Sequence, residues 1–137
     1  MADIVVGYDG SDCGRCALDA ATELAKELGD RIVVAFSYEL SRLGGEVADM
    51  AAALEERGRK ILEEASSTVK AAGVEVDAVL GSEASADALA ELAAQRKARM
   101  IVVGTYGDSP IKGAILGSTP HKLLHISEAP VLVVPAK

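Results

Sequence analysis

Short and almost uninterrupted apolar runs recur along the chain, separated by stretches in which apolar and polar positions alternate with a helical period. The runs cover residues 3–8, 31–38, 74–80, 99–105 and 130–135. Strands buried on both faces read as near-continuous apolar runs, and such strands are typical of parallel sheets. We therefore expect five strands in a parallel sheet.

The stretches between these runs have the marks of amphipathic helices. The first follows the N-cap candidates Ser11 and Asp12 and stops at Gly29, a residue type that often ends helices. The second covers residues 46–73 and carries an apolar stripe along one face, while residues 85–97 and 120–127 predict a third and a short fourth helix.

Strands and helices in strict alternation predict an α/β protein with a single doubly wound sheet, in one domain over residues 1–137. The pattern leaves two strand orders open, 2-1-3-4-5 and 3-2-1-4-5. In either order a ligand binds beyond the carboxyl ends of the strands, where the winding reverses. In the second order that point lies between the first and fourth strands, which brings residues 7–11 beside residues 104–109.

The acidic balance of the chain excludes some partners. Fourteen Lys and Arg stand against 21 Asp and Glu, which gives a formal net charge of −7 and argues against nucleic acid or an anionic membrane as the main partner. A small anionic ligand stays compatible, because helix N-termini and backbone amides bind phosphate without net positive charge. No apolar run reaches the roughly 18 residues of a membrane span, and residues 1–10 lack the features of a signal peptide. We expect a cytoplasmic protein.

Glycine and hydroxyl residues are concentrated in one segment, GTYGDSPIKGAILGST, at residues 104–119. Ser118 or Thr119 followed by Pro120 predicts a helix with a hydroxyl N-cap and proline at its first position. Exposed amides, a helix dipole and hydroxyls together can cradle a phosphate. The chain has neither a Walker A pattern nor GxGxxG, so this cradle would be of another kind. The alternative is that the glycines serve only to turn the chain.

The spacing Gly104-x2-Gly107-x9-Gly117-Ser118 resembles the ATP-binding signature of the universal stress protein family. The segments IVVGYDGSDCGRCAL, VEVDAVLGSEASADALAELA and APVLVVP also resemble family segments, in family order along the whole chain. The resemblance implies a Rossmann-like sheet of order 3-2-1-4-5 and a homodimer that pairs through the C-terminal strand, residues 131–134. It also implies a cytoplasmic role in stress or growth-arrest responses.

The resemblance implies ATP as the ligand and assigns residues to it. Gly7 is included in the predicted site as the start of the turn that carries Asp9. Asp9 matches the acid that contacts the adenosine part, and Phe36 matches the adenine contact. Gly104, Gly107, Ser118 and Thr119 match positions that hold the ribose and phosphates. At Gly117 we expect a backbone that other residues do not tolerate and a close approach to the triphosphate.

Two positions depart from the binding members of the family. Pro120 stands where these members commonly carry an amide-bearing residue, which removes one phosphate donor. Asp108 places a carboxylate beside the phosphate path, where it either repels the phosphates or helps to hold Mg²⁺ against them, and we favour the metal.

Other residues suggest alternative functions. Cys13 and Cys16 form a CxxC at a helix start, the place of a dithiol redox centre, but two free thiols in a reducing cytoplasm are the simpler interpretation. His121 and His125 lack a third ligand for a metal. The sequence places no nucleophile beside a base, so we predict at most slow ATP hydrolysis. The preferred hypothesis is a nucleotide-dependent regulatory protein, and the alternatives are an ATP-independent interaction module and a dithiol redox protein.

Overall fold

The computed structural model describes residues 1–37, 47–81, 85–105 and 116–136. Strands and helices alternate there as predicted, and each predicted strand is confirmed to within two residues. The elements are β1 (Asp3–Gly7), α1 (Asp12–Leu28), β2 (Arg31–Ser37), α2 (Val47–Ala71), β3 (Val76–Gly81), α3 (Ser85–Arg96), β4 (Met100–Gly104), α4 (Ser118–Ile126) and β5 (Val131–Val134).

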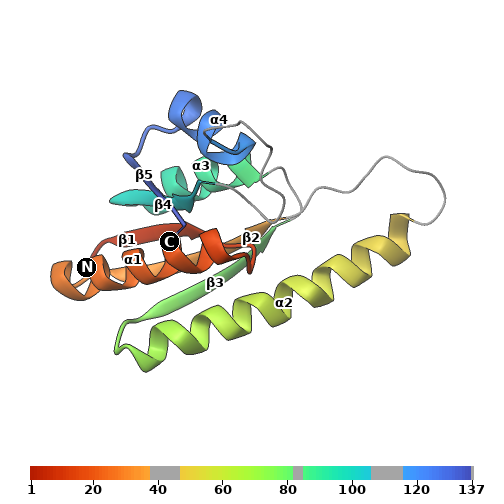
Figure 1. Ribbon diagram of the computed structural model, residues 1–137, viewed down its shortest axis with the longest axis horizontal. Coiled ribbons are helices and arrows are strands. Elements are labelled where there is room, and N and C mark those ends of the chain that lie inside the picture. The colour runs from red at the N-terminus through yellow and green to blue at the C-terminus, as the bar shows by residue number, and fades with distance from the viewer. Residues whose placement is uncertain (38–46, 82–84, 106–115, 137) are drawn as a thin grey trace.

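In this part of the chain the strands form one five-stranded parallel sheet with the order β3-β2-β1-β4-β5 (Figure 1). The central strand β1 pairs on one side with β2, where Val5 lies opposite Val33, and on the other side with β4, where Val5 lies opposite Ile101. The winding therefore reverses between β1 and β4. Of the two strand orders that the pattern left open, this is the one that the family resemblance implied.

Alternate side chains of the strands enter two apolar clusters, one on each face of the sheet. Ile4 and Val6 pack with α1 and α2 on one face, and Val5 and Val103 pack with α3 and α4 on the other (Figure 1). Both faces of the strands are thus covered, which is why their sequences read as uninterrupted apolar runs.

The ends of α1 confirm the sequence analysis. Ser11 is the N-cap, and its hydroxyl accepts a hydrogen bond from the Gly14 amide. Gly29 ends the helix in the left-handed region, with φ of 72°. Within the described ranges, none of the helices, α2 included, combines the length and the apolarity that crossing a bilayer needs.

The start of α4 differs from the prediction. The N-cap is Gly117, with extended backbone, and no side chain caps the helix, so Ser118 and Thr119 occupy its first two positions. The Gly117 amide donates to the carbonyl of Thr105 at 2.6 Å, and its carbonyl accepts from the His121 amide. This contact with the end of β4 begins the helix two residues earlier than expected. Pro120 is then third, where its missing N–H still costs no intrahelical bond.

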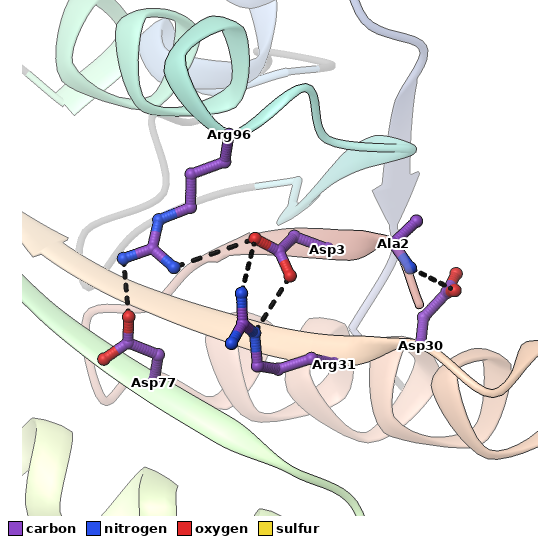
Figure 2. Close-up of polar contacts among 6 residues, drawn as sticks. All are labelled: Ala2, Asp3, Asp30, Arg31, Asp77 and Arg96. Atoms are coloured by element: carbon purple, nitrogen blue, oxygen red, sulfur yellow. Dashed lines mark hydrogen bonds and ion pairs between the residues drawn. The ribbon is translucent and has the colours of Figure 1, made fainter.

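At the end of the sheet where the strands begin, ion pairs connect several elements, as Figure 2 shows. The buried carboxylate of Asp3 accepts from Arg31 at 2.9 and 3.1 Å, and Arg96 lies 3.7 Å from the same carboxylate. Arg96 also pairs with Asp77 of β3. These contacts connect β1, β2, β3 and the end of α3, and the sequence analysis did not foresee them.

A second buried carboxylate, Asp30, lies at the same end of the sheet between α1 and β2. Its Oδ1 accepts from the Ala2 amide at 3.1 Å (Figure 2), and both of its oxygens accept from Arg99. The Arg99 guanidinium and the Ala2 amide hold the pKa of this carboxyl below its ordinary value, against the opposing effect of burial. This end of the sheet is therefore fixed by charge as well as by apolar packing.

Candidate functional site

The candidate site lies where the carboxyl ends of β1 and β4 meet. The start of α1, which follows β1, lies directly against the end of β4: the thiol of Cys13 is 3.7 Å from the hydroxyl of Thr105. This juxtaposition is the one expected for the order 3-2-1-4-5. Thr105 contacts both the start of α1, through Cys13, and the start of α4, through Gly117.

The turn after β1 holds the Asp9 carboxylate in a fixed orientation. Its Oδ1 accepts from the Ser11 amide at 2.9 Å and from the Ser11 hydroxyl. That hydroxyl in turn accepts from the Gly14 amide at 3.1 Å, so the carboxylate completes the cap of α1. Among the described residues the other oxygen, Oδ2, has no hydrogen-bond partner, and Asp9 is half-buried. This oxygen is available to a ligand.

Two glycines that the site prediction did not include make this turn possible. Gly10 has a φ of +82°, a conformation that favours glycine. At Gly14 a Cβ would lie 2.8 Å from Oδ1 of Asp9, so a side chain there would displace the carboxylate. The stretch GSDCG at residues 10–14 was visible in the sequence, but the contact between Asp9 and Gly14 depends on how the helix follows the turn.

Gly104 and Gly7, both predicted site residues, have packing reasons to be glycine. A Cβ at Gly104 would lie 2.7 Å from the carbonyl oxygen of Cys13, which is backbone and cannot move aside. A Cβ at Gly7 would lie 2.8 Å from a methyl of Leu89, the end of a flexible side chain. Gly104 thus brings the start of α1 onto β4 whether or not a ligand is bound.

The start of α4 offers donors. Ser118 is exposed and Thr119 is half-buried, and within the described part of the chain their amides have no hydrogen-bond partner. The first amides of a helix point outward and favour anions. Gly117 has a φ of −69°, which any residue adopts, so the expectation of a glycine-only backbone there is wrong. The remaining reason for a glycine at position 117 is that it has no side chain.

The remaining predicted site residues are less accessible or lie elsewhere. Phe36 is 8% exposed and belongs to the apolar cluster under α1 and α2, where a Cβ at Gly58 would lie 2.7 Å from its ring. Only a small part of the residue is left for a ligand. Gly107 and Asp108 lie outside the described residues.

Tyr8 is a neighbour of the site that the sequence analysis missed. It is 5% exposed, its amide donates to the carbonyl of Ala35, and its phenol lies within the electrostatic influence of Arg15. Burial raises the pKa of the phenol, and the Arg15 guanidinium opposes this in part. The neutral ring therefore anchors the turn that carries Asp9 between β2 and α1.

The cysteines singled out in the sequence lie on α1 and the histidines on α4. Both thiols are free, with Cys13 buried and Cys16 half-buried on α1. The rings of His121 and His125 contact edge to face on α4, with their centroids 5.1 Å apart. Over the described ranges no group of three or more His, Cys, Asp or Glu residues is arranged to hold a metal ion.

Comparison with known proteins gives consistent matches. The model of the universal stress protein family matches residues 1–135. The universal stress protein YxiE of Bacillus subtilis is 32% identical, over 96% of this chain and 97% of the relative. The crystal structure of a universal stress protein in complex with cAMP is 35% identical, with a TM-score of 0.74 over 99% of this chain and 98% of that one. The universal stress protein UspA from Lactobacillus plantarum has a TM-score of 0.89 at 16% identity, over 97% of both chains, which shows the fold alone.

Proposed function

This chain belongs to the universal stress protein family, and from that premise we propose that it binds an adenine nucleotide, ATP in preference, as a regulatory module of cytoplasmic stress responses. The proposal is carried by two features at the same end of the sheet. One is the oriented Asp9 carboxylate, which follows β1, and the other is the set of open amides and hydroxyls at the start of α4, which is bound to the end of the adjacent strand β4. The relative solved with cAMP supports the ligand class.

The adenosine part of the ligand is assigned to the β1 side of the site. Oδ2 of Asp9 accepts a hydrogen bond from a sugar hydroxyl, while Oδ1 remains bound to Ser11. The carboxylate needs no rearrangement, so little entropy is lost when the ligand binds. Phe36 is assigned to the base, although only 8% of the residue is exposed.

The phosphates are assigned to the β4 and α4 side. The amides and hydroxyls of Ser118 and Thr119 donate to phosphate oxygens, and the helix dipole favours their charge. Gly107 and Gly117 keep side chains away from this path, and Gly104 lets the start of α1 pack against the end of β4 beside it. The net charge of −7 does not oppose binding at such a site, because the donors are local.

Mg²⁺ is assigned to Asp108. Carboxylate and phosphate oxygens are the ligands that Mg²⁺ takes in proteins, so the residue fits the chemistry of a cation held against the phosphates. When bound, the ion would neutralise phosphate charge. Asp108→Asn should then reduce the dependence of ATP affinity on Mg²⁺ and leave AMP affinity unchanged.

The test of the proposal is the ligand itself. Native mass spectrometry of freshly purified protein should show a bound adenine nucleotide, and calorimetry on the stripped protein should rank ATP above AMP, cAMP and adenosine. If cAMP binds more tightly than ATP, the proposed nucleotide site stands and the proposed preference for ATP is wrong. Failure of all four to bind would overturn the proposal.

One observation favours a second candidate, an interaction module that needs no ATP. The packing of Gly104 against the Cys13 backbone explains this signature glycine without any ligand. The same calorimetry distinguishes the two, because a module of this kind shows no heat with any of the four ligands.

A further inference from the structure

The two cysteines are placed where a disulfide would act on the candidate site. The chain has no other cysteine, and both are on α1, separated by Gly14 and Arg15. Cys16 is half-buried and can be reached from solvent, whereas Cys13 is 7% exposed and faces the end of β4. Any intramolecular disulfide must join these two sulfurs.

The bond is within reach but requires the helix to change. Residues three apart on a helix have Cβ atoms about 5–6 Å apart, whereas a disulfide needs about 3.5–4.5 Å. The first turns of α1 must therefore tighten by roughly 1–2 Å. Gly14, between the two cysteines, has no side chain to obstruct this movement.

The movement would reach both sides of the site. Gly14 donates to Ser11, which holds Asp9, so a shift of the first turn moves the carboxylate. Cys13 packs its carbonyl on Gly104 and its thiol against Thr105, and Thr105 accepts the hydrogen bond that begins α4. Pulling the Cys13 sulfur toward Cys16 removes its contact with Thr105.

We infer that Cys13 and Cys16 form a reversible disulfide that weakens nucleotide binding, so that the site responds to the thiol redox state. The disulfide rests on the geometry of α1, and its effect on the nucleotide rests on the proposed function.

The reaction is a thiol–disulfide exchange with a small-molecule disulfide such as oxidised glutathione. The thiolate of Cys16 attacks one glutathione sulfur and displaces a glutathione thiolate, which gives a mixed disulfide. The thiolate of Cys13 then attacks the Cys16 sulfur and displaces the second glutathione thiolate. Two electrons pass from the cysteines to glutathione, and the two cysteine protons end on the two glutathione thiols.

The first measurement detects the bond. Wild-type protein is equilibrated in glutathione buffers of increasing oxidised fraction, alkylated and weighed by mass spectrometry. Both alkylation sites should disappear together and return with dithiothreitol. The control variant Cys16→Ser has a single cysteine, so it cannot form the intramolecular disulfide and should show no paired loss of alkylation sites. Wild-type protein that keeps both free thiols, or carries only glutathione adducts, in the most oxidising buffer would overturn the inference.

The second measurement tests the coupling. Calorimetry should show that oxidation weakens the affinity for ATP at least about tenfold and that dithiothreitol restores it. The affinity of Cys16→Ser should be the same in oxidising and in reducing buffer. Hydrogen exchange of the Gly117 amide, which reports its bond to Thr105, should become faster in the oxidised protein. A disulfide that changes neither quantity contradicts the inference. If the reduced protein does not bind ATP, the proposed function fails, and the Gly117 exchange rate still decides the coupling.

Discussion

The Asp9 carboxylate has two tasks that belong to different oxygens. Oδ1 completes the cap of α1 through Ser11, and Oδ2, which has no partner among the described residues, is the oxygen that we propose binds the ligand. In this proposal a single residue links the stability of a helix start to ligand binding. Gly117, in contrast, has no structural requirement of its own, because its backbone angles suit any residue. Its substitution changes only the space beside the start of α4.

These properties give a contrast between two variants. Asp9→Asn keeps an oxygen for Ser11 but replaces the other oxygen with a donor, so the affinities for adenosine and ATP should both fall by about tenfold, or ~1.4 kcal/mol. Gly117→Val should weaken ATP by at least a similar factor and leave adenosine unchanged. Calorimetry with both ligands measures this. If Gly117→Val binds ATP like wild type, the phosphates do not pass this residue.

Gly104→Ala should destabilise the fold, because its Cβ would meet the Cys13 backbone. The expected loss in the free energy of unfolding is about 1–3 kcal/mol, the usual cost of overpacking. Gly7→Ala is the matched control and should lose less, because Leu89 can turn its methyl aside. Urea denaturation measures the free energy of unfolding of the two variants. Equal losses would contradict the prediction and show that the backbone at the end of β4 can move to accommodate the Cβ.

At the scale of elements, the strands were predictable from the sequence because burial on both faces leaves a direct trace in apolar runs. The start of α4 was not, since the hydroxyls and Pro120 form a plausible cap by themselves, whereas the actual start depends on the bond between Gly117 and Thr105. The pairing of Asp3 with Arg31 and Arg96 was not foreseen either. These residues are distant in sequence and meet only when strand order and register are known.

Some features of the candidate site were likewise predictable from the sequence and others were not. The juxtaposition of the turn after β1 with the end of β4 was predicted from the strand order, and the family resemblance assigned Asp9 to the ligand. The interior position of Phe36 was not, because the alternation along β2 directs its ring under α2, toward Gly58. A contact inherited by resemblance has to be checked against the side of the sheet that the residue faces.

The Asp30 carboxylate predicts how the junction of α1 with β2 responds to acid. Its pKa is lowered in the folded protein, so its contribution to stability is present above the unfolded pKa of about 3.9 and is lost as pH falls through the lower folded value. Asp30→Asn should cost about 1 kcal/mol at pH 7, since Arg99 is partly exposed to solvent. Urea denaturation of wild type and variant should converge below pH 3, and a constant difference would contradict this.

At the scale of the whole molecule, β5 is the edge strand beside β4, and an apolar edge invites pairing with another copy. We propose the homodimer that the family resemblance implied, formed through this strand across a two-fold axis. Val133, a natural choice from the sequence for a disruptive variant, packs into the cluster with α3 and α4. Leu132 is the better position, because 38% of it is exposed.

Leu132→Glu should therefore convert a dimer into a monomer without loss of secondary structure, since a buried charge at the interface has no partner. Leu28→Glu is the control, because Leu28 is 45% exposed at the end of α1 and should leave the dimer intact. Light scattering at micromolar concentration gives the mass of each. A monomeric wild type would contradict the homodimer.

The hydrogen bond from Gly117 to Thr105 closes the chain into a ring whose ends belong to the fold. The start of α4 is therefore placed by the end of β4, although twelve positions separate Thr105 from Gly117 in the sequence. A strand end that moves takes the first turn of this helix with it.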